Sequence, residues 1–126
     1  MVSIDAKNAI VEIQVSDPAR SRDWYSRLFG KAPDLEPFPG NVEFKVGGAR
    51  VQIVAEKPQP TSWNLQIEVN DLTSERQRLQ EQGIEATEIK GVPKVISYFD
   101  VKDPDGNRMR WFQVLTTDPK VTGAQS

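Results

Sequence analysis

The sequence predicts an α+β fold of two tandem βαβββ modules, at residues 8–57 and 62–115, whose mixed sheets curl around a trough with the helices outside. Three observations support this fold class. Apolar and polar residues alternate in one stretch of each half, 9–15 and 63–69, as in a strand with one buried face. Each stretch is followed at once by a Ser-Asp or Asn-Asp pair that can cap a helix. Each half then ends in strands around a glycine-containing turn, so the whole pattern occurs twice.

The first module opens with the strand at 9–15 and a helix. One face of the strand is apolar and is expected to enter the core, while the other face carries Ile10, Glu12 and Gln14. Asp17 and Pro18 predict the start of the helix, because Asp caps free N–H groups and proline is tolerated in the first turn. Gly30 predicts its end after Phe29.

Three strands complete the first module. Residues 32–38 predict a weak edge strand, because two prolines interrupt the pattern. Residues 41–46 and 50–55 predict a hairpin around Gly47-Gly48. Gln52 lies on the second strand of this hairpin.

A polar connector at 58–61 leads into the second module, which repeats the order of the first. Its opening strand is again apolar on one face, and the other face carries Asn64, Gln66 and Glu68. Asn70-Asp71 and Gly83 predict the start and the end of a helix over 72–82.

Three further strands are predicted at Ile84 to Ile89, Val95 to Lys102 and Arg108 to Leu115, before a frayed tail at 116–126. The residues between the last two strands, 103–107, read Asp-Pro-Asp-Gly-Asn and predict a tight turn. On the last strand one face carries Arg108, Arg110 and Phe112. Tyr98 lies on the strand before the turn.

Composition narrows the function classes. The chain has 126 residues, a formal charge of −2 and no block of basic residues, which argues against nucleic-acid binding. No apolar run is long enough to span a membrane, and no signal-peptide pattern opens the chain, so a single cytoplasmic domain is expected. Cysteine and histidine are both absent, which removes thiolate chemistry and the commonest metal ligand.

Two motifs, residues 15–30 (Val-Ser-Asp-Pro-Ala-Arg-Ser-Arg-Asp-Trp-Tyr-Ser-Arg-Leu-Phe-Gly) and 103–107, resemble the vicinal oxygen chelate superfamily. That superfamily includes glyoxalase I, extradiol dioxygenases, fosfomycin-resistance transferases and bleomycin-resistance proteins. With the duplicated βαβββ order, the resemblance covers about residues 8–115. It implies the fold strongly, but it leaves the chemistry open because the superfamily hosts several activities.

The resemblance also implies where a metal would be bound. Metal-using members place His and Glu ligands on the first and last strands of each module, and those places correspond here to Ile10, Gln52, Asn64 and Arg110. Ile10 has no donor atom, Arg110 is a permanent cation, and amide oxygens seldom hold a transition metal alone. No bound metal and no cofactor are therefore expected. A hard-cation site that includes Glu12 or Glu68 is the remaining alternative.

The resemblance and the missing ligands together predict a metal-free protein that binds or sequesters a small molecule, as the bleomycin-resistance branch does. The alternative is a lyase, isomerase or dioxygenase type of enzyme with an atypical metal site, or with Glu12 or Glu68 as acid or base. The candidate ligand-binding residues are Ile10, Glu12, Gln14, Gln52, Asn64, Gln66, Glu68, Tyr98, Arg108, Arg110 and Phe112. Each of them also has a simpler interpretation as a trough wall, a core residue or a solvated strand face.

Arg110 is the predicted anchor of the ligand. Its guanidinium suits an anionic or carbonyl-rich aromatic ligand, and without ligand it should pair with Glu12, Glu68 or a bound anion. Relatives commonly close the trough by pairing modules across a two-fold axis, so the resemblance also implies a homodimer.

Overall fold

The computed structural model describes residues 9–57 and 65–119. The chain divides into two compact units, residues 1–59 and 60–126, and each is described by itself. The predictions for the connector at 58–61, for Asn64 and for the tail beyond residue 119 fall outside the described residues. No described helix is long and apolar enough to cross a membrane.

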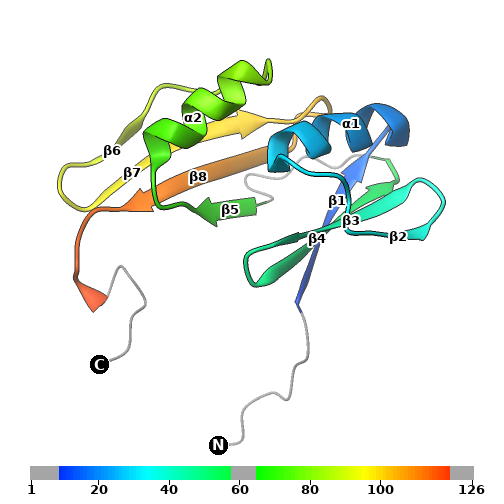
Figure 1. The fold of residues 1–126 in the computed structure, drawn as a ribbon, viewed down its shortest axis with the longest axis horizontal. Helices are drawn as coiled ribbons and strands as arrows, with labels where there is room; N and C mark the ends of the chain where they lie inside the picture. The colour runs from blue at the N-terminus through cyan, green and yellow to red at the C-terminus, as the bar shows by residue number, and fades with distance from the viewer. Residues whose placement is uncertain (1–8, 58–64, 120–126) are drawn as a thin grey trace, which may run out of the picture. The chain divides into compact units, whose positions relative to one another are not determined.

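Unit 1 contains one helix and a four-stranded mixed sheet (Figure 1). Its elements are β1 (Ile10–Val15), α1 (Pro18–Phe29), β2 (Leu35–Phe38), β3 (Asn41–Val46) and β4 (Ala49–Ala55). The strand order is β1-β4-β3-β2, with β1 parallel to β4 and the other neighbours antiparallel. The predicted β, α, β, β, β order of the first half is confirmed, with the edge strand shorter than predicted.

Local sequence explains the position of α1. The Asp17 carboxylate accepts a hydrogen bond from the Arg20 N–H at 3.1 Å, and Gly30 ends the helix in the left-handed conformation at φ 71°. The apolar face of α1 packs on the sheet, where the rings of Phe29 and Phe44 are 5.0 Å apart. The core beneath the helix is formed by Ile13, Val15, Tyr25, Leu28, Val42, Phe44, Val51 and Ile53.

Unit 2 repeats this order (Figure 1). Its elements are β5 (Leu65–Glu68), α2 (Leu72–Glu81), β6 (Lys90–Val92), β7 (Ile96–Lys102) and β8 (Arg108–Val114). The strand order is β5-β8-β7-β6, with β5 parallel to β8. Position by position, β5 therefore corresponds to β1, β8 to β4 and β7 to β3.

Two hydrogen bonds from β8 fix α2 on its sheet. The buried Trp111 donates its Nε1–H to Glu75 Oε1 at 3.1 Å. The side-chain oxygen of Gln113 accepts the otherwise unpaired N–H of Leu72 in the first turn, at 2.9 Å. The odd-numbered residues of β8 therefore face α2, as the alternation in the sequence predicted.

The prediction of a strand at Ile84 to Ile89 is wrong. That segment is irregular, and the short strand β6 begins only at Lys90. Thr87 makes two hydrogen bonds to the backbone of Asp100, as a residue of a neighbouring strand would. Its N–H donates to the Asp100 carbonyl oxygen, and its hydroxyl oxygen accepts the Asp100 N–H. The guanidinium of Arg76 binds the carbonyl oxygens of Ala86 and Thr87, so a side chain satisfies groups that a strand would have paired.

The turn at 103–107 forms as predicted. One oxygen of the buried Asp103 carboxylate accepts the N–H groups of Asp105 and Asn107, at 2.9 and 2.8 Å. Its other oxygen accepts the Asn107 amide at 2.7 Å. Gly106 takes a positive φ of 87°. This turn sets the register of β7 against β8, and with it the partner of Arg110.

Candidate functional site

In each unit the helix covers one face of the sheet, and the opposite face, here called the helix-free face, carries polar residues. On unit 1 a row crosses three strands in register: Glu12 on β1, Gln52 on β4 and Glu43 on β3. A residue and its neighbours two positions away point to the same side of a strand, so Ile10, Gln14 and Arg50 share this face. Five of these six side chains are polar, on a sheet whose other face is apolar.

Glu43 is the most buried member of this row, with 0% of the residue exposed. Its carboxylate accepts hydrogen bonds from Gln52 Nε2 at 2.9 Å and from Arg50 Nε at 2.7 Å, and Arg50 Nη2 also lies at 2.7 Å. The Gln52 hydrogen bond, followed by the Arg50 contacts, holds the pKa of Glu43 below its usual value although burial opposes this. Glu43 is therefore an ionised carboxylate held in place on both sides.

A cavity of about 240 Å³ opens at one end of this face. It is lined by Glu12, Pro37, Phe38, Asn41, Val42, Gln52, Val54, Ala55 and Glu56. Two of these residues carry carboxylates, and no lysine or arginine lines the cavity within the described part of the chain. Apolar surface comes from Phe38 and Pro37 in the edge strand and from Val54.

On unit 2 the equivalent row is Gln66 on β5, Arg110 on β8 and Asp100 on β7. Arg110 binds the Asp100 carboxylate through Nε at 2.8 Å and through Nη2 at 3.2 Å. Its guanidinium carbon also lies 3.9 Å from the centre of the Tyr98 ring, a cation–π distance. The hydrogen bonds to Asp100 raise the pKa of Arg110 above its usual value, so its charge is permanent.

The carboxylate partner of Arg110 is thus Asp100, and the prediction of Glu12 or Glu68 was wrong. Asp100 and Arg110 are directly opposite in the antiparallel ladder, where cross-strand side chains approach most closely. The sequence contains the signal for this pair, because the two residues are equally far from Asp105 in the middle of the turn. In the first module, Gln52 and Glu43 are likewise equally far from the turn at Gly47-Gly48 and are directly opposite in the ladder. Glu43 was not among the site residues predicted from the sequence.

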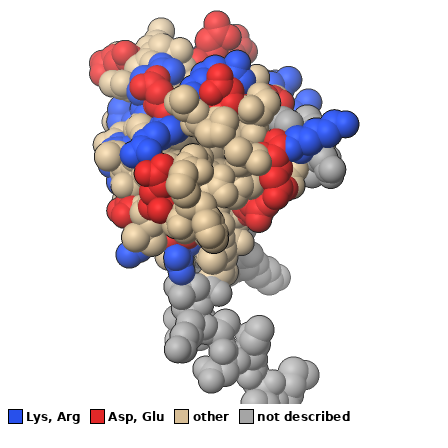
Figure 2. All heavy atoms as spheres, turned by 90° about the vertical axis from the view of Figure 1, so that its right-hand side faces the viewer, with Lys and Arg blue, Asp and Glu red and all other residues tan. Residues whose placement is uncertain are grey.

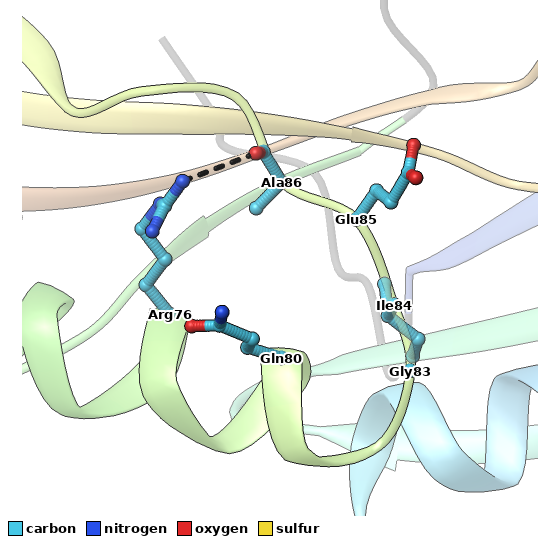
Figure 3. Close-up of a pocket in the computed structure, with 6 residues that line it drawn as sticks. All are labelled: Arg76, Gln80, Gly83, Ile84, Glu85 and Ala86. Atoms are coloured by element: carbon cyan, nitrogen blue, oxygen red, sulfur yellow. Dashed lines mark hydrogen bonds between the residues drawn. The ribbon is translucent and has the colours of Figure 1, made fainter.

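A larger cavity, of about 470 Å³, lies on the helix side of unit 2 (Figure 3). It is lined by Arg76 and Gln80 of α2 and by residues 83–86. Arg76 extends from the helix to the Ala86 carbonyl oxygen, where the dashed line marks their hydrogen bond of 3.3 Å. Among the predicted ligand-site residues that the structure describes, none lines this cavity. Its arginine holds the irregular segment in place.

A sequence model of the Glyoxalase/Bleomycin resistance protein/Dioxygenase superfamily matches residues 8–110. The chain belongs to this superfamily. The match spans both units, and the duplicated βαβββ order of the structure agrees with it. No curated protein was found to match the chain.

Several solved structures have the same fold. A glyoxalase/bleomycin resistance protein from Catenulispora acidiphila is 22% identical over 86% of this chain and 99% of its own, with a TM-score of 0.75. An antibiotic binding protein from a Streptomyces species is 21% identical over 90% and 99%, with a TM-score of 0.71. A lactoylglutathione lyase from Agrobacterium tumefaciens is 16% identical over 87% and 94%, with a TM-score of 0.69. At these identities the likeness shows the shared fold and does not choose between binding and catalysis.

Three of the four positions where the resemblance implied superfamily metal ligands are described. Ile10 offers no donor and is 49% exposed. The Gln52 amide nitrogen is bound to Glu43, and Arg110 is bound to Asp100. Within residues 9–57 and 65–119 there is no group of three or more His, Cys, Asp or Glu residues that could hold a metal ion.

The structure groups the other predicted site residues by unit. Gln14 lies on the unit 1 face and donates to Glu56 at 3.1 Å. On unit 2 the helix-free face carries Gln66, Glu68, Tyr98, Arg108, Arg110 and Phe112, as their register shows. Lys102 is opposite Arg108 and Lys90 is opposite Tyr98, so basic residues outnumber acidic ones on this face. Figure 2 shows basic and acidic side chains interspersed on the surface that it presents.

Proposed function

We propose that the protein binds a small organic molecule non-covalently and without a metal ion, on the helix-free faces of its sheets. The observation that carries this proposal is the matching polar row: Glu12, Gln52 and Glu43 in unit 1, and Gln66, Arg110 and Asp100 in unit 2. Removing a charged group wholly or partly from water costs free energy, and both rows hold such groups in fixed hydrogen bonds. Polar groups that are fixed before a ligand arrives lose little entropy when it binds.

On unit 2 the proposed ligand group is an aromatic acid or a phosphate. The face combines Arg108 and Arg110 with the rings of Tyr98 and Phe112, so it offers positive charge beside flat apolar surface. Asp100 and Tyr98 hold the Arg110 guanidinium in one orientation. An anion bound at this face would replace water around the Arg110 guanidinium, whose orientation is already fixed before binding.

The donor chemistry supports binding without a metal. At the positions that correspond to superfamily ligands, an isoleucine has no lone pair to offer and an arginine repels a cation. The oxygen of Gln52 is the one donor left at the three described positions, and a single neutral amide oxygen is a poor site for a transition metal. Ligand affinity is therefore expected to be the same before and after treatment with a chelator.

The experiment is a thermal-shift screen of small aromatic acids and phosphates, followed by calorimetry of each hit on an Arg110→Met variant. The loss of the guanidinium should weaken an anionic ligand by roughly 2 kcal/mol, at the low end for a buried charge pair because the Arg110 side chain is 26% exposed. Arg27→Met is the matched control, since it also removes an ion pair, with Asp23, but on the outside of α1.

If a ligand binds Arg110→Met as tightly as it binds Arg27→Met, Arg110 is not part of the binding site. Binding that disappears with a chelator would show that a metal is required. Either result contradicts part of the proposal, the first its anchor and the second its metal-free character.

A second candidate function is metal-free acid–base catalysis by Glu12. Glu12 lines the 240 Å³ cavity, and its carboxylate has no hydrogen-bond partner among the described residues. A carboxylate without a fixed partner at a cavity is available to move a proton. Turnover of a bound hit, followed by mass spectrometry and abolished in Glu12→Gln, would favour this candidate over simple binding.

A further inference from the structure

We propose that the 240 Å³ cavity of unit 1 binds the protonated amine of an organic ligand, beside an aromatic or apolar group. This inference rests on the proposed function, because it specifies the chemistry of the ligand at one of the two helix-free faces. It does not depend on the anion preference of unit 2, because all the described residues that line the cavity belong to unit 1.

The side chains at the cavity offer mainly hydrogen-bond acceptors. Glu12 and Glu56 contribute carboxylates. Because Gln52 uses its amide nitrogen to bind Glu43, its carbonyl oxygen is left to accept a further bond. Asn41 adds a donor, since its side-chain oxygen already accepts the Ala55 N–H at 3.1 Å. An ammonium group, which has three donors and no acceptor, fits such a set.

The arginine of this face, Arg50, is committed to Glu43. Arg50 is held by Glu43 through contacts of 2.7 Å, and it pairs in register with Lys45 and Ile10 at the far end of the face. The cavity lies at the other end, beside Val54 and Asn41. An amine that enters it therefore meets two carboxylates, and no lysine or arginine is among the described lining residues to compete with it.

Phe38 adds an aromatic surface to the same cavity. It is 67% exposed, the most exposed of the large apolar residues in the described chain, and it follows Pro37 in the edge strand β2. Exposure of an apolar ring to water is unfavourable, so a ligand group that covers Phe38 gains binding free energy. An ammonium group or a ring over its face would gain a cation–π or stacking contact.

The test uses three probes of similar shape and different charge: benzylammonium, benzyl alcohol and benzoate. Each is titrated into the ¹⁵N-labelled full chain at equal ionic strength, and amide shifts are followed by NMR. Benzylammonium should shift the amides of Asn41, Val54 and Ala55 and bind more tightly there than benzyl alcohol. Of the two, only the binding of benzylammonium should become weaker when salt is added, because salt screens the attraction between charges.

Glu12→Gln should weaken benzylammonium by roughly three- to fivefold, the size expected for one partly exposed charge pair, and leave benzyl alcohol unchanged. Glu85→Gln is the matched control, because Glu85 is an exposed carboxylate on the helix side of unit 2. Phe38→Leu should weaken benzylammonium and benzyl alcohol together, since it removes the ring and keeps an apolar side chain.

Equal affinity of the amine and the alcohol at the cavity, a preference there for benzoate, or no effect of Glu12→Gln would overturn the inference. The proposed function survives those results if any probe shifts amides on either helix-free face. If none of the three probes shifts amides on either face, both the inference and the proposed function are wrong.

Discussion

Among single residues, Glu43 couples the candidate site most directly to folding. Its lowered pKa means that the ionised form stabilises the folded chain above the ordinary glutamate pKa, and that this contribution is lost as pH falls through the lower folded-state value. Glu43→Gln should therefore cost roughly 1–3 kcal/mol at pH 7, less than for a wholly buried pair because Arg50 is 28% exposed. The difference from the unmodified protein should shrink toward zero in acid.

Urea unfolding of both proteins over a pH series measures this difference. Glu85→Gln provides the baseline, because Glu85 is exposed and its substitution should give a small difference in stability. A Glu43→Gln difference that stays constant from neutral pH into acid would show that the carboxylate is not held as its contacts indicate.

The residues that sequence reasoning placed correctly are those whose position follows from alternation along one strand. Ile10, Glu12 and Gln14 share a face for that reason, and so do Arg108 and Arg110. The partners Glu43 and Asp100 depend instead on the register between strands, which the turn fixes. Counting outward from each turn identifies both, whereas alternation alone identifies neither.

At the scale of elements, the β6–β7 hairpin depends on Gly91. Its φ of 152° lies outside the region that other residues adopt easily, and a Cβ atom there would overlap the Ile96 carbonyl oxygen. Gly91→Ala should therefore destabilise unit 2 by at least about 1–3 kcal/mol. Gly48→Ala is the control, because a Cβ at Gly48 meets nothing within 4 Å and that glycine has no positive φ.

Chemical denaturation of the two alanine variants checks this prediction, and hydrogen exchange at Ser97 and Tyr98 shows whether the loss is centred on the hairpin. Equal stability of Gly91→Ala and Gly48→Ala would mean that the hairpin backbone adapts without cost.

Helices and most strands could be predicted from the sequence, because caps, glycine stops and alternation are local signals. The bounds of α1 follow from Asp17 and Gly30. The irregular segment before β6 could not be predicted in this way, because its backbone is satisfied by Arg76 and Asp100, which are distant in sequence. A short apolar and polar alternation such as 84–89 fits a strand equally well until those partners are known.

At the scale of the whole molecule, we predict a homodimer with two-fold contacts. The outer strands of the unit 1 sheet expose large apolar side chains: Ile10 on β1 at 49% and Leu35 on β2 at 43%. Exposed apolar edges favour association. Sedimentation velocity at micromolar concentration should give a dimer that Ile10→Lys shifts toward monomer, and a monomeric unmodified protein would refute the prediction.

The two buried tryptophans of the described chain have an optical consequence. Trp24 lies in unit 1 against Tyr25, with ring centres 4.9 Å apart, and Trp111 lies in unit 2. An indole in an apolar core emits at shorter wavelength than one in water. Once Trp63 is replaced by phenylalanine, each unit keeps a single tryptophan. In variants that retain only Trp24 or only Trp111, the shift of tryptophan emission to longer wavelength on heating therefore reports the melting of one unit at a time.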